Sequence, residues 1–129
     1  MSDPGSIFAR LMAVIEDRKA KRPEKSYTTT LLAGGSEKIG EKIREEAAEI
    51  AAAAAEPGDR GRDHTIGEAA DCIYHLFVLL AHRDIRLSEV EAELERRFGT
   101  SGLDEKAARG ASNVETRNVE RKPAADFPS

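Results

Sequence analysis

Two pairs of acidic residues, each with a spacing of three, are the features of this sequence best suited to chemistry. Glu46 and Glu49 form one pair, and Glu68 and Asp71 form the other. Residues three apart on a helix project from the same side of it. If the two pairs lie on two helices that pack face to face, we expect four carboxylates to converge.

Four converging carboxylates are stable only if a cation is present or if the pKa values of the carboxyl groups are raised. Two unit negative charges about 4 Å apart repel by about 4 kcal/mol at an effective dielectric constant of 20, and burial adds a cost for each unpaired charge. Ligation by carboxylate oxygens alone suits magnesium or manganese better than zinc or copper. The two acidic pairs therefore predict a site for Mg2+, with Mn2+ as the alternative ion.

The first acidic pair falls in a long helix that we predict over residues 36–56. Glu46 lies about 20° outside the apolar stripe of this helix, whereas Lys42 and Glu49 flank the stripe at about 60° and 80°. We therefore expect Glu46 to point toward a helix interface and Glu45 to face solvent. The stripe is about 80° wide and consists of Ile39, Ile43, Ala47, Ile50 and Ala54.

The second pair falls in a helix predicted over residues 65–83, which Thr65 and Glu68 would open as a capping box. Its apolar residues cover more than half of its circumference, so we expect it to be central and buried. Its polar strip carries too few basic residues to neutralise the acids. The apolar residues are Ile66, Ala69, Ala70, Ile73, Leu76, Phe77 and Leu80, and the strip contains Glu68, Asp71, His75 and His82.

Each of these features also has a purely structural interpretation. The EExxE string around Glu46 is common on surface helices, where it forms ion pairs with Lys42 and Arg44. Glu68 is explained equally well as the capping partner of Thr65. His75 fits a hydrogen-bonded structural role better than contact with a metal site or a phosphate. A di-iron bundle would need Glu-x-x-His motifs, which the chain lacks.

The N-terminal part predicts two further helices. Apolar residues at helical spacing, from Ile7 to Ile15, predict a helix over residues 6–22 that ends before Pro23. After a short polar link, Ser26 or Thr28 is expected to cap a brief helix that stops at Gly34-Gly35.

Between and after the acid-bearing helices we predict loops and one more helix. Residues 57–64 are rich in charge and glycine, which is typical of a mobile loop. Ser88 and Glu91 match a second capping box, for a helix over residues 88–98. Residues 100–129 offer almost nothing to bury and are expected to be a disordered tail. The functional domain is therefore placed at residues 5–99.

Composition narrows the class of protein. A formal net charge of −4 with mixed charges gives no footprint for nucleic acid. Cys72, the single cysteine, excludes an internal disulfide and a cysteine-type zinc site, and we expect it to be a buried small hydrophobe. No apolar run is long enough to span a membrane, and the N-terminus lacks a secretory pattern. We therefore expect a cytoplasmic all-helical protein.

Several motifs together resemble the phosphoribosyl-ATP pyrophosphatase family, within the MazG-like all-α nucleoside-triphosphate pyrophosphatases. The superfamily shares an EExxE motif and a later ExxD, which match residues 45–49 and 68–71. Ser26-Tyr27-Thr28 and the Lys-x-x-Glu-Glu element at Lys42 indicate the histidine-biosynthesis branch. The resemblance covers residues 5–99, and the chain is too short and too cysteine-poor for the fused cyclohydrolase domain.

This resemblance implies magnesium-dependent hydrolysis of phosphoribosyl-ATP to phosphoribosyl-AMP and pyrophosphate. Glu46, Glu49, Glu68 and Asp71 would hold the metal, and Glu45 or Glu46 would act as general base. The family also implies an intertwined homodimer that completes the helical bundle, and the broad apolar surface of the 65–83 helix fits this. Implied substrate-binding residues are Arg18, Ser26, Tyr27, Thr28, Lys38 and Lys42.

Two alternatives remain open. One is a housekeeping nucleoside-triphosphate pyrophosphatase of the same fold, which acts on free nucleotides. The other is a non-enzymatic helical dimerisation module, in which the acidic residues form only a solvated surface.

Overall fold

The computed structural model describes residues 5–99, and every regular element within that range is an α-helix, which confirms the predicted all-α class. The residues up to Glu89 and those from Val90 onward form two units, and each is described by itself. The predicted disordered tail, residues 100–129, lies outside the described residues. The helices are α1 (Ile7–Lys21), α2 (Tyr27–Ala54), α3 (Gly58–His82) and α4 (Leu87–Phe98).

The first helix, α1, forms where the sequence predicts it. The Ser6 side chain accepts a hydrogen bond from the Ala9 backbone N–H at 3.1 Å and so caps the N-terminus. Arg22 ends the helix in the left-handed conformation, with φ of 52°, directly before Pro23. At this end Lys19 donates to the backbone carbonyls at the C-terminus of α3, with 2.8 Å to the oxygen of Ala81.

The second helix, α2, contains the interruption that the glycine pair predicts. Ser26 is its N-cap, with its hydroxyl oxygen 3.2 Å from the Thr29 backbone nitrogen. Gly35 has φ of 74° and ψ of −171°, so the helix axis changes there. A side chain at this φ would be strained, which explains glycine at the kink. The predicted brief helix and the predicted long helix are therefore the two arms of α2.

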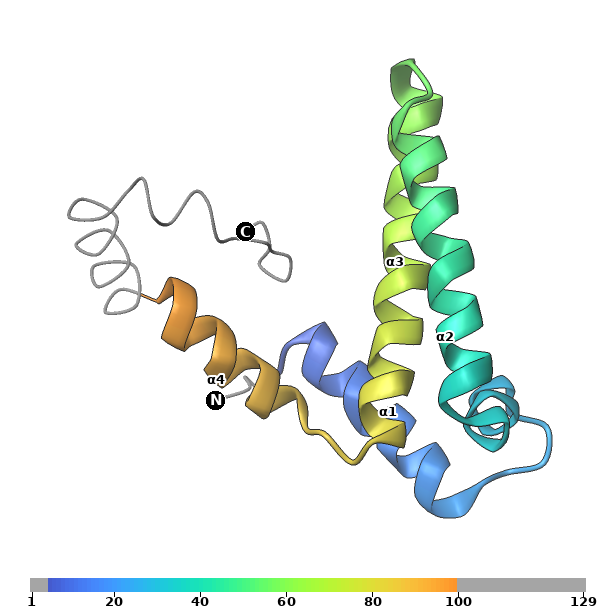
Figure 1. Cartoon of the computed structure of the whole chain (residues 1–129), viewed down its shortest axis with the longest axis vertical. Helices are drawn as coiled ribbons and strands as arrows, with labels where there is room; N and C mark the ends of the chain where they lie inside the picture. Colours follow the sequence, from blue (N-terminus) through green and yellow to red (C-terminus); the bar gives the residue numbers. More distant parts are fainter. Residues whose placement is uncertain (1–4, 100–129) are drawn as a thin grey trace. The chain divides into compact units, whose positions relative to one another are not determined.

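The predicted loop over residues 57–64 is wrong, because α3 already begins at Gly58. Only Ala55, Glu56 and Pro57 separate α2 from α3, so the two helices form a long antiparallel hairpin (Figure 1). The tight turn depends on the absence of a side chain at Gly61: a Cβ there would lie 2.0 Å from the Glu56 carbonyl oxygen.

The hydrophobic core lies where α1 packs against the open end of this hairpin. Ile15, Leu31, Ile39 and Val78 are its largest fully buried side chains. The rest of the core consists of Met12, Leu32, Phe77 and Ala81. Toward the hairpin tip the apolar burial thins to Ala53.

Two predictions about apolar faces need correction. In the 65–83 region, Ile66 is 55% exposed and Leu76 is 44% exposed, so α3 is not enclosed within one chain. The stripe on α2 is also displaced, since Ala47 and Ala54 are exposed whereas Glu46 and Ala53 are buried. Among the described residues, α3 packs mainly against α2, and alanine contributes little area to an interface.

The capping box predicted at Ser88 and Glu91 is wrong as well. Helix α4 begins at Leu87, one position earlier, and the backbone N–H of Arg86 donates to the Glu89 carboxylate at 3.0 Å.

Among the described residues, no helix combines the length and the apolar character needed to cross a membrane.

Candidate metal centre

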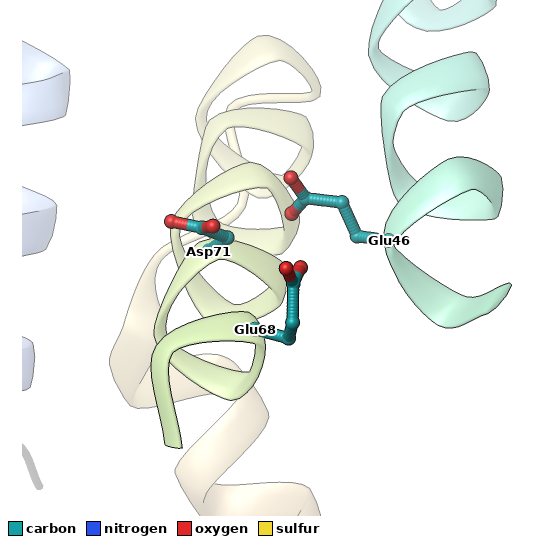
Figure 2. A group of neighbouring side chains, drawn as sticks. All are labelled: Glu46, Glu68 and Asp71. Carbon is teal, nitrogen blue, oxygen red and sulfur yellow. The ribbon is translucent and has the colours of Figure 1, made fainter. Parts of the chain in front are cut away.

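Three of the four predicted ligands converge. Glu46 on α2 and Glu68 and Asp71 on α3 each offer a carboxylate oxygen, and these three oxygens lie within 4.8 Å of one another. Figure 2 shows Glu46 reaching from α2 toward the two acids on α3. The convergence of the two pairs is therefore confirmed for these three residues.

The neighbouring acids on α2 lie outside this group. Glu49 is exposed and is not among the three clustered carboxylates, so its role as a ligand stays a prediction. Glu45 is also exposed, as predicted, and accepts a hydrogen bond from the Lys42 ammonium at 3.2 Å. This contact, with smaller contributions from Tyr27 and other neighbours, raises the pKa of Lys42.

Two of the acids lie in the seam between α2 and α3, that is, the line of buried residues along which the two helices pack. In each helix the residues of this seam repeat every seven positions. On the second arm of α2, Ile39, Glu46 and Ala53 are the buried residues, and they are seven positions apart. A strict seven-residue repeat keeps one face of a helix toward its partner. Glu46 therefore occupies a position that an apolar side chain would fill in an ordinary helix pair.

The facing seam of α3 has the same period. Gly61 and His75 are buried and Glu68, midway between them, is partly buried. Glu46 and Glu68 therefore meet in the seam between the two helices. The polar seam of α3 coincides with part of the strip predicted from the sequence.

Glu68 has no capping role, contrary to one structural interpretation. Thr65 lies inside α3, and its hydroxyl donates to the Gly61 backbone carbonyl at 2.7 Å. The Oε1 atom of Glu68 is buried and has no hydrogen-bond partner among residues 5–99. An unsatisfied buried carboxylate oxygen is costly, so this atom is suited to a ligand.

The other oxygen of Glu68 faces a histidine that the sequence analysis overlooked. His64 Nε2 is 3.3 Å from Glu68 Oε2, and His64 Nδ1 is 3.1 Å from the Glu56 carboxylate. The hydrogen bond to Glu56 is the main cause that raises the pKa of His64. Its i,i+4 spacing to Glu68 was the available signal, but it has meaning only if residues 57–64 are helical.

The three acids are short of positive charge. Within residues 5–99, neither lysine nor arginine forms an ion pair with Glu46, Glu68 or Asp71. Two ionised oxygens that lie within 4.8 Å of each other repel by at least roughly 3 kcal/mol at an effective dielectric constant of 20. Oxygen ligands, negative charge and the unpartnered Glu68 atom together fit a hard divalent cation.

His75 is hydrogen-bonded, as its structural interpretation expected, but its partner belongs to the acid cluster. Its Nδ1 lies 2.9 Å from Glu46 Oε1, and its Nε2 lies 3.3 Å from the Tyr27 hydroxyl. Both His75 and Glu46 are buried, at 5% and 7% exposure. His75 therefore connects the acids to the first turn of α2.

The three predicted hydroxyl contacts for substrate all have partners inside the chain. Ser26 caps α2, Tyr27 meets His75, and the Thr28 hydroxyl is hydrogen-bonded to the hydroxyl of Tyr74. Thr28 is buried, whereas Tyr27 is half exposed. Burial is the main cause that raises the pKa of Tyr74.

The predicted basic contacts are more accessible. Lys38 is exposed on α2, and Lys42 is partly exposed one turn further along. Arg18, on α1, is partly buried, and its charge acts on Tyr74 in the direction that lowers the Tyr74 pKa. Both lysines therefore lie on the same helix as Glu46.

Comparisons with known proteins match nearly the whole described region. Residues 8–98 match the model of the phosphoribosyl-ATP pyrophosphohydrolase family. A protein of Rhodopirellula baltica named phosphoribosyl-ATP pyrophosphatase is 61% identical over 102 residues, which cover 79% of this chain and 85% of the relative.

Two further relatives carry the same name. The protein of Cereibacter sphaeroides is 55% identical over 105 residues, which cover 81% of this chain and 99% of that relative. The protein of Rhodobacter capsulatus is 53% identical over 103 residues, which cover 80% and 97%.

Proposed function

The chain belongs to the phosphoribosyl-ATP pyrophosphohydrolase family, a family of hydrolases, and from this we propose that it hydrolyses phosphoribosyl-ATP to phosphoribosyl-AMP and pyrophosphate. This is the second step of histidine biosynthesis. The observation that carries the substrate assignment is the identity to relatives named for this activity, across nearly the whole of their length. Cytoplasmic residence stays a prediction from the sequence.

We propose that Glu46, Glu68 and Asp71 hold Mg2+, or Mn2+ in its place. The main support is the buried Oε1 atom of Glu68, which has no hydrogen-bond partner in the described part of the chain and belongs to a group with two further carboxylates. Glu49 is proposed as a fourth ligand because it is one helical turn from Glu46 on the same helix. When bound, the ion would offset charge on the substrate phosphates and orient a water molecule.

The reaction then needs a proton acceptor and groups that bind an anionic substrate. Water attacks the α-phosphorus and pyrophosphate leaves, while Glu45 or Glu46 accepts the proton of the water. Lys42 and Lys38, one turn apart on α2, present two ammonium groups along the polyphosphate. Arg18, Ser26, Tyr27 and Thr28 are the remaining candidates for contact with substrate.

The substrate assignment is tested by comparing phosphoribosyl-ATP with free nucleoside and deoxynucleoside triphosphates. We expect kcat/KM for phosphoribosyl-ATP to be the highest, measured as pyrophosphate release at saturating Mg2+. Faster turnover of the free triphosphates would favour the housekeeping pyrophosphatase instead. The non-enzymatic module is disfavoured, because the chain belongs to a family of enzymes.

Calorimetric titration with Mg2+ and Mn2+ tests the metal site separately from the substrate. Asp71→Asn should weaken binding at least tenfold, and Glu49→Gln should do so if Glu49 is a ligand. Glu41→Gln is the matched control, since Glu41 is an exposed acid on the same helix. Absence of binding by the wild-type chain would refute the metal site.

We also propose a homodimer. Helix α3 leaves Ile66 and Leu76 largely uncovered, and α1 leaves Phe8 48% exposed. A second chain would cover such apolar surface, and symmetric dimers are the commonest assembly of soluble proteins.

A further inference from the structure

We propose that His75 is a positioning residue, which holds Glu46 in a ligand-ready orientation through its Nδ1–H group. This inference rests on the metal site proposed above. It concerns a histidine to which no role in the reaction has been assigned so far. The two ring nitrogens of His75 have different surroundings.

The Nδ1 nitrogen of His75 faces two acceptors. It lies 2.9 Å from Glu46 Oε1 and 2.9 Å from the backbone oxygen of Asp71. A backbone carbonyl and an ionised carboxylate can only accept a hydrogen bond. Nδ1 must therefore carry a proton that it donates to them.

The Nε2 nitrogen has a different partner. It lies 3.3 Å from the Tyr27 hydroxyl, which can donate or accept. With the proton of a neutral imidazole on Nδ1, the Tyr27 hydroxyl donates to Nε2. The two acceptors at Nδ1 select the tautomer in which Nδ1–H faces Glu46, and the Tyr27 hydroxyl stabilises it by donating to the unprotonated Nε2.

This arrangement links both halves of the acid cluster. The imidazole joins the Glu46 side chain on α2 to the backbone of Asp71 on α3. A glutamate side chain has several freely rotating bonds, and ordering it costs conformational entropy. His75 restricts Glu46 before any cation arrives and engages Oε1, so that Oε2 remains available as a ligand atom.

A residue that hydrogen-bonds to a metal ligand and orients it affects metal affinity strongly. Hydrogen-bond partners that orient metal ligands typically change affinity or activity by about 10- to 100-fold when they are removed. His75 is 5% exposed and Glu46 is 7% exposed, so water does not readily replace the missing donor.

The test uses two amide substitutions that mimic different halves of the ring. In His75→Asn the amide N–H lies near the position of Nδ1, so it can still donate to Glu46. In His75→Gln the amide lies near the position of Nε2, so the contact with Tyr27 is kept and the donor to Glu46 is lost. Mg2+ and Mn2+ affinities are measured by calorimetry on the full chain, beside the melting temperature of the metal-free protein.

We expect His75→Asn to keep affinity within about threefold and His75→Gln to lose about 10- to 100-fold. In the Gln variant, the metal concentration for half-maximal hydrolysis should rise more than the rate at saturating metal falls. His82→Gln, a histidine replacement on the same helix, should leave metal affinity unchanged. Equal losses in the Asn and Gln variants, or none in Gln, would overturn the proposal.

A measurement on the unmodified chain keeps the proposal testable even if the variants do not fold. Nitrogen-15 NMR of the metal-free protein should show His75 protonated at Nδ1 and unprotonated at Nε2, and Tyr27→Phe should weaken this preference. An Nε2–H tautomer in the wild-type chain would refute the role of His75. Failure of the wild-type chain to bind either metal would instead refute the metal site itself.

Discussion

At the scale of single residues, the acid cluster departs from the rules of stable packing, as the proposed metal site would require. One carboxylate oxygen of Glu68 is buried without a partner among the residues that the structure describes, and the other lies beside His64. Glu46 occupies a seam position where an apolar side chain would pack. Sites under functional constraint commonly depart from the rules of stable packing in this way.

Replacing Glu68 by glutamine should therefore separate stability from function. Glu68→Gln removes a negative charge from the cluster and supplies donors that neighbouring carboxylates can accept. We expect the metal-free protein to gain about 1 kcal/mol or more, which corresponds to about 4–8 °C in melting temperature for a domain of this size. Metal affinity should fall at least tenfold.

Thermal unfolding in a chelator and calorimetric titration measure the two effects. The exposed acid Glu41 offers the comparison, since Glu41→Gln should change neither quantity. A lower melting temperature for Glu68→Gln in the metal-free protein would mean that Glu68 is structural.

At the scale of elements, the hairpin of α2 and α3 determines which acids meet. Its turn is so short that Gly61 lies against the Glu56 backbone. The turn brings the two heptad seams into register, with Glu46 opposite Glu68. A change at the turn therefore affects the acid cluster from a distance along the helices.

We expect Gly61→Ala to destabilise the hairpin by about 1–3 kcal/mol, the usual cost of overpacking. The added Cβ would lie 2.0 Å from the Glu56 carbonyl oxygen, so backbone must move. Gly67→Ala on the same helix is the matched control, because nothing lies within 4 Å of its added Cβ. Alanine there should stabilise the helix by about 0.5–1 kcal/mol.

Chemical unfolding of the two variants measures this difference. If Gly61→Ala proves as stable as Gly67→Ala, the tight turn is not needed for the hairpin. Metal titration of Gly61→Ala then shows whether a shifted register weakens the site.

At the scale of the whole molecule, the described residues of one chain leave several large apolar side chains exposed. The core is concentrated near α1, while the hairpin extends beyond it with Ile66 at 55% exposure. A small single core gives limited stability, so a partner chain would contribute substantially.

We expect the wild-type chain to sediment at twice the mass of one chain, and Leu76→Asp to shift it toward the monomer. Leu76 is 44% exposed on α3, and a charge there would be buried without a partner in a dimer. Lys25→Asp, in the exposed link between α1 and α2, serves as the control and should leave the dimer intact. A monomeric wild type would contradict the proposed assembly.

The sequence by itself determined the helical class, the extent of the first helix, Ser26 as one of two candidate caps, and the break at Gly35. These features depend on local backbone preferences, which act within a few residues. It also placed Glu46 near a helix interface, because the direction of a side chain on a helix follows from its position in the repeat. The motifs around Glu46 and Glu68 indicated the superfamily, and Ser26-Tyr27-Thr28 with the element at Lys42 indicated the family.

Tertiary structure decided what local preference could not. Residues 57–64 are helical although their composition is typical of a loop, because Gly61 packs on Glu56 and His64 pairs with the same residue. Because α3 begins before Thr65, Thr65 lies within the helix and not at its N-terminus. Glu68 therefore does not have the capping role that the sequence predicts. The contact of His75 with Glu46 joins residues 29 positions apart, and only the register of two packed helices determines such a pair.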